Sequence, residues 1–210
     1  MINKRPKYKT SGLPEAQGLY NPANEHDACG VGMVLDVKNR ASYEIVSKGL
    51  AMLCNLEHRG AVGADPKAGD GSGILIQIPH KFLNKKLSGD FNLPNVGDYG
   101  VGVIFMPKEK NSQDKIKNLV EENCKKEGIN ILGWRTCPTQ TGDLGWSVLP
   151  STPDVFQVFV ERSINQKTQD DFERKLYILR RCIEESIVKI SKTIKEGFYI
   201  PSLSSRTLLY

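Results

Sequence analysis

One cysteine of this sequence, Cys29, stands where covalent chemistry could take place. The residues just before it, Glu25 to Ala28, are acidic and turn-like, and an apolar run from Gly30 to Val37 begins directly after it. A thiolate is a strong nucleophile for acyl transfer, although most cysteines in globular proteins are only small buried side chains. The position of Cys29 between these two stretches favours a role as a nucleophile over that of a buried side chain.

Other catalytic patterns are sparse. Because the chain has only three histidines, His26, His58 and His80, a histidine-based triad is possible only in principle. Gly30–Gly32 lacks the third glycine of a dinucleotide-binding motif, and Ala68–Gly73 lacks the Lys-Ser/Thr pair of a phosphate-binding loop. The five cysteines form no Cys-x-x-Cys pair, and no His-Glu-x-x-His occurs. We therefore expect no metal site in this chain.

Hydrophobic periodicity predicts the elements that would position these residues. Strands are expected at 30–37, 74–78, 99–106, 129–135, 155–161, 198–203 and 207–210, and helices at 42–58, 79–86, 112–127 and 169–195. Ser112 is expected to cap the third helix. Strand 99–106 is apolar at nearly every position, which is typical of a strand buried on both faces. The apolar stripe of helix 169–195 favours packing on a sheet over a coiled-coil seam. This order predicts a layered α/β or α+β protein.

Composition narrows the function classes. The 210 residues fit one domain, with 39% hydrophobic and 25% charged residues. The formal charge of +5 comes from scattered lysines and arginines rather than a basic block, so we expect no nucleic-acid partner. No apolar run approaches the ~20 residues that span a bilayer, and residues 1–28 lack the apolar centre of an export signal. The odd, widely spaced cysteines predict a reducing, cytoplasmic location.

Four blocks of the sequence together resemble one enzyme family. In chain order, each is similar to a signature at the start of the large subunit of glutamate synthase: Tyr20–Gly32, Leu56–Ala61, Gly69–Ile74 and Pro201–Thr207. The blocks stand in the family's order and cover nearly the whole chain. The resemblance therefore implies a class II glutamine amidotransferase domain at residues 29–210, preceded by a leader at 1–28.

The resemblance implies an N-terminal-nucleophile hydrolase with a four-layer α/β/β/α sandwich, incomplete in this chain. In that family the leader is removed at the bond before the cysteine, which here is Ala28–Cys29. A thiol pKa near ~8.5 and an α-amine pKa near ~7.7–8.0 let the amine of such a cysteine take the thiol proton without a histidine. The expected reaction is attack of Cys29 on the glutamine side-chain amide, followed by hydrolysis of the thioester.

The resemblance also assigns Arg59 to the α-carboxylate of glutamine, for which a guanidinium fork is well suited. An arginine at the end of helix 42–58 could instead simply face the helix dipole. The glycines of 69–73 are expected to permit tight turns and are assigned no chemistry. The expected partners are L-glutamine and the remainder of glutamate synthase, which transfers ammonia to 2-oxoglutarate. FMN and an iron–sulfur cluster belong to other parts of that enzyme, so no cofactor is expected in this segment.

The family places its oxyanion-hole Asn-Gly pair beyond the last matched block, outside these 210 residues. Loss of one oxyanion donor lowers turnover ~100- to 1,000-fold, so we expect weak or no glutaminase activity from this chain alone. Two other interpretations stay open at this point. One is a non-catalytic truncated subunit that docks onto a separate synthase subunit, and the other is an amidase of the same fold acting on a different amide.

Overall fold

The fold was analysed in a computed structural model, which describes residues 16–18, 30–56, 64–68, 71–190 and 192–210. Its elements in chain order are α1 (Tyr43–Asn55), β1 (Leu75–Gln77), α2 (His80–Leu87), β2 (Tyr99–Met106), α3 (Lys110–Lys126), β3 (Ile131–Thr136), the 3-10 turn η3 (Leu149–Ser151), β4 (Asp154–Glu161), α4 (Gln169–Val188), α5 (Lys192–Gly197), β5 (Tyr199–Ser204) and β6 (Thr207–Leu209).

The described strands form two antiparallel sheets. The larger sheet has the order β3-β4-β2-β5, and the smaller one pairs β1 with β6. Strand β2 pairs with β4 along its full length, from Tyr99 opposite Glu161 to Met106 opposite Asp154. Because every pairing is antiparallel, the described part of the chain is α+β, in agreement with the sequence-based expectation.

Strand β2 is buried on both faces, as its continuous apolar pattern predicts. Its odd-numbered residues, such as Val101 and Val103, lie in the cluster shared with α2 and β6. Its even-numbered residues, such as Ile104, lie in the cluster shared with α3 and α4. Gly100 lets α4 approach, because a Cβ there would lie 2.8 Å from a methyl carbon of Leu176.

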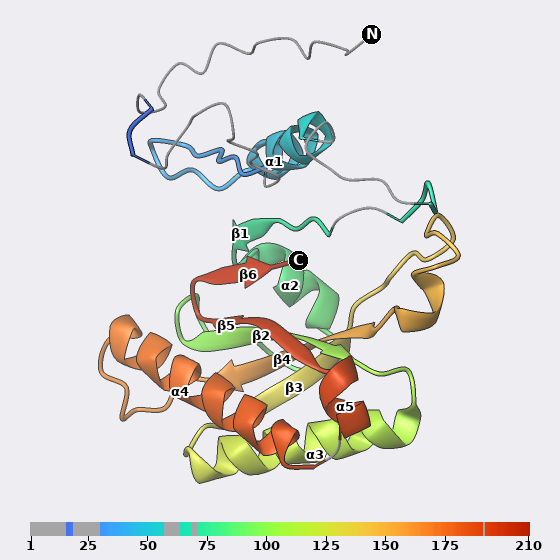
Figure 1. Ribbon diagram of the computed structural model, residues 1–210. Helices are drawn as coiled ribbons and strands as arrows, with labels where there is room; N and C mark the ends of the chain where they lie inside the picture. Colours follow the sequence, from blue (N-terminus) through green and yellow to red (C-terminus); the bar gives the residue numbers. More distant parts are fainter. Residues whose placement is uncertain (1–15, 19–29, 57–63, 69–70, 191) are drawn as a thin grey trace, which may run out of the picture.

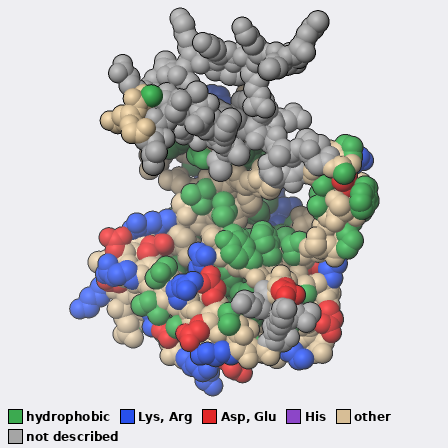
Figure 2. Space-filling view, viewed as in Figure 1, with side chains coloured by type: hydrophobic (Ala, Val, Ile, Leu, Met, Phe, Trp, Pro, Cys, Tyr) green, Lys and Arg blue, Asp and Glu red, His purple; other side chains and the backbone are tan. Residues whose placement is uncertain are grey.

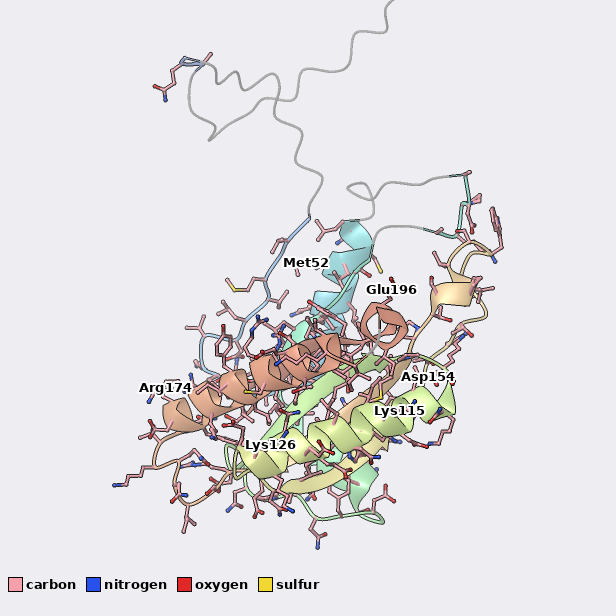
Figure 3. All side chains as sticks on the ribbon, turned by 60° about the horizontal axis from the view of Figure 1, so that its bottom comes forward. Met52, Lys115, Lys126, Asp154, Arg174 and Glu196 are labelled. Carbon is pink, nitrogen blue, oxygen red and sulfur yellow. The ribbon has the colours of Figure 1, made fainter. Side chains whose placement is uncertain are left out.

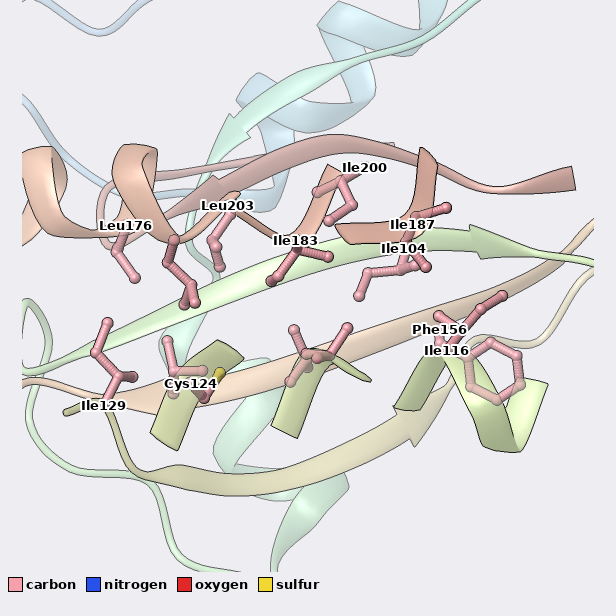
Figure 4. Packing of buried hydrophobic residues seen from close by; sticks show 14 of the residues in the cluster. Ile104, Ile116, Cys124, Ile129, Phe156, Leu176, Ile183, Ile187, Ile200 and Leu203 are labelled. Atoms are coloured by element: carbon pink, nitrogen blue, oxygen red, sulfur yellow. The ribbon is translucent and has the colours of Figure 1, made fainter. Parts of the chain in front are cut away.

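Helices α3 and α4 lie side by side and antiparallel on one face of the larger sheet (Figures 1 and 3). The apolar stripe predicted for α4 is buried at Phe172, Leu176, Leu179, Ile183 and Ile187. Figure 4 shows several of these side chains meeting those of α3 and the sheet. The stripe therefore packs on a sheet and on a neighbouring helix, and this is the main core of the protein.

The other face of the larger sheet is covered by α2 and the β1–β6 pair, with α1 on the far side of that pair (Figure 1). Leu83 and Leu87 of α2 and Leu208 of β6 complete the second core cluster. Gly49 of α1 faces the side chain of Ile74, which immediately precedes β1. The larger sheet therefore has helices α3 and α4 on one face, and α2 and the smaller sheet on the other.

The start of α4 is held by a capping box. The Thr168 hydroxyl accepts a hydrogen bond from the backbone N–H of Asp171 at 3.1 Å, and the Asp171 carboxylate accepts one from the backbone N–H of Thr168 at 3.0 Å. We expect Thr168→Ala to lower the free energy of unfolding by about 1 kcal/mol, because it leaves a helix-end donor without its partner. Urea denaturation measures the free energy of unfolding of this variant. The control is Thr168→Ser, which keeps the hydroxyl and should lose less stability. Equal losses in the two variants would contradict the explanation.

Three sequence-based expectations are wrong. Residues 30–37 form no strand, and Val31 and Val37 are more than nine-tenths exposed. Ser112 lies inside α3, whose N-cap is Glu109, and its hydroxyl donates to the Glu109 carboxylate. The long helix predicted at 169–195 ends at Val188 and continues as the separate helix α5.

The reasons for these errors are physical. An apolar run shows that a segment favours burial but does not supply a partner strand, and no described element forms a backbone ladder with residues 30–37. Helix α4 ends in short-range bonds from the N–H of Lys189 to the Ser186 carbonyl and from the N–H of Ile190 to the Ile187 carbonyl. Ile190 is 45% exposed there, whereas Ile194 of α5 is buried again in the main core, so the stripe continues across a break in the helix.

Figure 2 shows positive and negative side chains intermixed over the lower, helical part of this face, and hydrophobic side chains gathered over its middle. On this face the net charge of +5 therefore forms no single positive patch. Among the described residues, no helix has both the length and the apolar character needed to cross a membrane.

Candidate active site

Ala28, Cys29 and Arg59, the residues assigned to cleavage, catalysis and substrate binding, lie outside the described residues. The nearest described residues on each side can be placed. Gly30 faces the end of α1, where a Cβ on Gly30 would lie 3.1 Å from a methyl carbon of Leu56. Gly32 faces Met52, one turn earlier on the same helix (Met52 is labelled in Figure 3). The segment after Cys29 and the helix before Arg59 are therefore in contact.

A buried carboxylate, that of Asp65, connects two loops that are far apart in the sequence. Asp65 accepts hydrogen bonds from the backbone N–H and the hydroxyl of Ser147, at 2.9 and 2.8 Å. It also accepts one from the backbone N–H of Lys67 at 3.1 Å. A Cβ on Gly145 would lie 2.3 Å from the Asp65 carboxylate, so this close approach requires glycine there. The loop that precedes the glycine-rich segment is thus tied to the connection between β3 and β4.

These hydrogen bonds give a pH-dependent prediction. They hold the pKa of Asp65 below its ordinary value, chiefly through the backbone N–H of Ser147. Because the folded-state pKa is depressed, the stabilisation is present above the unfolded-state pKa and is lost as the pH falls through the folded-state value. We expect Asp65→Ala to melt at a lower temperature than the native chain at pH 7, and the gap to narrow below about pH 4. Melting curves across this range test it, and a gap independent of pH would contradict it.

The glycine-rich segment leads into the smaller sheet through a close backbone approach. A Cβ on Gly73 would lie 2.7 Å from the backbone oxygen of Tyr210. The backbone N–H groups of Ile74 and Tyr210 donate to each other's carbonyl oxygens, at 2.8 and 3.0 Å. Gly71 has open space around it. Gly73 therefore permits a close backbone approach, and the tight turns expected of this segment stay a prediction.

The remaining described cysteines differ in their reactivity. Burial raises the pKa of the Cys124 thiol to about 12, and burial also raises the pKa of Cys137. Both are therefore protonated, and weak nucleophiles, near neutral pH. Cys54 on α1 is exposed, and all four described cysteines are free thiols. Cys54 is consequently the described thiol most open to an added electrophile.

His80 is the first residue of α2, and its Nδ1 lies 3.1 Å from the Tyr99 hydroxyl. Burial raises the pKa of Tyr99 to about 12, so the phenol stays protonated in this contact within the fold. No set of three or more His, Cys, Asp or Glu side chains suited to a metal ion occurs in the part of the chain that the structure describes.

Sequence reasoning missed two polar groupings. One is the Asp65–Ser147 contact, whose only signal is the turn-forming Asp-Pro pair at residues 65–66. The other joins Arg135, Gln157 and Tyr210 through side-chain hydrogen bonds. Its signal is a single glutamine within the apolar run of β4.

Comparison with known proteins gives one family. The model of the class II glutamine amidotransferases matches residues 29–210. The chain is 42% identical over 200 residues to the large chain of an NADPH glutamate synthase from Bacillus subtilis. It is 34% identical over 224 residues to an NADH glutamate synthase from Schizosaccharomyces pombe, and 36% identical over 211 residues to a ferredoxin-dependent glutamate synthase from Pyropia yezoensis.

These alignments cover 94%, 100% and 100% of this chain, respectively. They cover only 13%, 10% and 14% of the three relatives. The chain therefore spans about a tenth to a seventh of the length of these proteins.

Proposed function

Because the chain belongs to the class II glutamine amidotransferases, we propose that the domain to which it belongs releases ammonia from L-glutamine through a thioester on Cys29. The observation that carries this proposal is the family match itself, which begins at Cys29 and leaves residues 1–28 outside. That boundary supports a leader at 1–28, cut between Ala28 and Cys29, and a catalytic domain from residue 29. The contact between Gly30 and Leu56 supports a site in which Cys29 and Arg59 act together.

The chemistry follows from an N-terminal cysteine. The free α-amine accepts the thiol proton, and the sulfur attacks the side-chain amide carbon of glutamine. The carbon–nitrogen bond then breaks, and the α-ammonium group returns the proton to the departing ammonia. Water hydrolyses the thioester to glutamate and restores the thiol. Arg59 holds the substrate α-carboxylate through its guanidinium fork. The uncut chain lacks this amine, so cleavage of the leader is required for activity.

The fold proposed for this site is the four-layer α/β/β/α sandwich of N-terminal-nucleophile hydrolases. The described layers support it, because α3 and α4 cover one face of the larger sheet, the β1–β6 pair faces the other, and α1 lies beyond that pair (Figure 1). The likeness to glutamate synthases supports a wider role. The ammonia would then pass to 2-oxoglutarate in a part of the enzyme outside these residues.

FMN and an iron–sulfur cluster would likewise belong to those other parts. The described residues do not fit such a cluster, since they offer no set of three metal-ligating side chains. The partners proposed are L-glutamine and the rest of a glutamate synthase. The four free cysteines support the proposal of a reducing, cytoplasmic location.

The test is the intact mass of the purified chain before and after exposure to a diazo ketone analogue of glutamine. We expect a mass lacking residues 1–28, with one adduct that peptide mapping assigns to Cys29. An uncut and unlabelled chain would contradict the proposal and favour the non-catalytic docking subunit. A cut chain that reacts with iodoacetamide at Cys29 but not with the glutamine analogue would favour an amidase for another amide.

A further inference from the structure

A cavity of about 270 Å³ lies where β3 ends and β4 begins, beside Tyr210. Apolar side chains of α2, the β3–β4 connection and β4 form part of its wall: Phe82, Pro138 and Val155. The polar side chains that line it are Arg135, Cys137, Thr139 and Tyr210. The proposed glutaminase reaction assigns no role to any of these residues.

Arg135 brings a positive charge to this cavity. Its Nη1 donates to the Gln157 side-chain oxygen at 2.8 Å and to the Cys137 sulfur at 3.6 Å, and both acceptors are neutral. No ion pair between described residues includes Arg135. A guanidinium group has five N–H donors, and a partly buried charge is stabilised by an anion that replaces lost water. The arginine is therefore placed to bind an anionic group.

Gln157 fixes the orientation of the groups around it. It is fully buried on the face of β4 that points toward the smaller sheet. Because arginine can only donate, the amide oxygen of Gln157 must face Arg135, and its NH₂ group then faces Tyr210. That NH₂ group donates to the Tyr210 hydroxyl oxygen at 2.6 Å. Arg135 and Tyr210 are thus held in one rigid arrangement.

The Tyr210 hydroxyl has a hydrogen to give. Its oxygen accepts a hydrogen bond from the Gln157 NH₂ group, which leaves its own O–H for a further acceptor. Burial raises the pKa of Tyr210 above its ordinary value, and burial likewise raises the pKa of Cys137. Both groups are therefore neutral near pH 7, so Arg135 is the charged side chain among the described residues that line the cavity.

We propose that this cavity binds a small carboxylate-bearing molecule. The carboxylate accepts hydrogen bonds from the Arg135 guanidinium and the Tyr210 hydroxyl, and its carbon chain lies against Phe82, Pro138 and Val155. One guanidinium and one phenol suit a monoanion better than a phosphate, which carries more charge and more acceptor oxygens. A volume of about 270 Å³ lies at the lower end of ligand pockets, so the ligand has the size of an amino acid or less.

The site would lie directly beside the glycine-rich segment, because the backbone of Tyr210 pairs with Ile74. It differs from the carboxylate contact assigned to Arg59, which lies on another segment of the chain. The inference does not depend on the amidotransferase reaction, so each can fail without the other.

The test is a nuclear magnetic resonance titration of the ¹⁵N-labelled chain with sodium acetate and, separately, sodium phosphate, at constant ionic strength. We expect acetate to shift the backbone amides of Cys137, Thr139 and Tyr210 along one saturating curve, and phosphate to bind more weakly. Arg135→Gln should weaken acetate binding about tenfold or more, the effect of losing a charge-assisted hydrogen bond. Tyr210→Phe should weaken it less, since the guanidinium remains.

The matched control is Arg181→Gln, which removes the same charge from an exposed position on α4. This variant should bind acetate as the native chain does. Because Arg135→Gln can disturb Gln157, Arg135→Lys is measured as well. Its affinity for acetate should lie between that of the native chain and that of Arg135→Gln. Shifts that do not saturate, that occur only elsewhere, or that are equal in Arg135→Gln and Arg181→Gln would overturn the proposal. Equal binding of acetate and phosphate would overturn the assignment to carboxylates.

Discussion

Replacing Cys29 with alanine is expected to abolish the glutamine-dependent adduct and to reduce ammonia release to the uncatalysed background. In the proposed mechanism the sulfur forms the covalent bond to the substrate. Loss of the nucleophile in a comparable acyl-transfer enzyme lowers turnover on the order of 10⁶-fold, so any ammonia release that the native chain shows should be lost. The measurement is mass spectrometry of the chain after reaction with the diazo ketone analogue, together with an ammonia assay.

Cys54→Ala is the matched control, because Cys54 is exposed and lies on α1. This variant should keep the adduct and its dependence on glutamine as a competitor. Cys124 and Cys137 need no such control, since burial raises the pKa of both thiols. An adduct that persists in Cys29→Ala and disappears in Cys54→Ala would assign the reactive thiol to α1 and contradict the proposed nucleophile.

The second large effect is expected in the core between α4 and the larger sheet. Leu179→Ala should lower the free energy of unfolding by about 2–5 kcal/mol, because it removes buried methyl groups and leaves a cavity that the packing cannot fully close. Leu179 has no exposed surface and lies in the main core cluster. Urea denaturation monitored by circular dichroism measures the change. The comparison requires that the free energy of unfolding falls with urea concentration at the same slope in both proteins.

The neighbouring residue on the same helix provides the control. Ile178 is 47% exposed, so Ile178→Ala removes a similar side chain from the outer side of α4. The free energy of unfolding of this variant should fall by less than about 1 kcal/mol. Similar losses in the two variants would show that helix propensity, rather than packing against the sheet, determines the stability of α4.

Local sequence patterns were sufficient to predict most of the helices and strands. Strand β2 begins and ends at the predicted residues, because an uninterrupted apolar run is compatible with a strand that has two covered faces. Helix α1, strand β1 and helix α2 also lie within a few residues of their expected positions. The family was recognised from four short blocks that stand in the family's order: Tyr20–Gly32, Leu56–Ala61, Gly69–Ile74 and Pro201–Thr207. The match to residues 29–210 confirms that recognition.

The pairing of distant segments was decided only by the tertiary structure. Asp65 and Ser147 are 82 residues apart, and nothing in either local pattern indicates that one will accept the other's hydrogen bonds. Gln157 would be read as an interruption of β4, yet it is fully buried, because Arg135 and Tyr210 from other elements satisfy its amide. The residues of a strand show whether that strand favours burial, whereas the whole fold decides which other element covers it. That is why β2 could be predicted, while the exposed run at 30–37 and the Arg135 cavity could not.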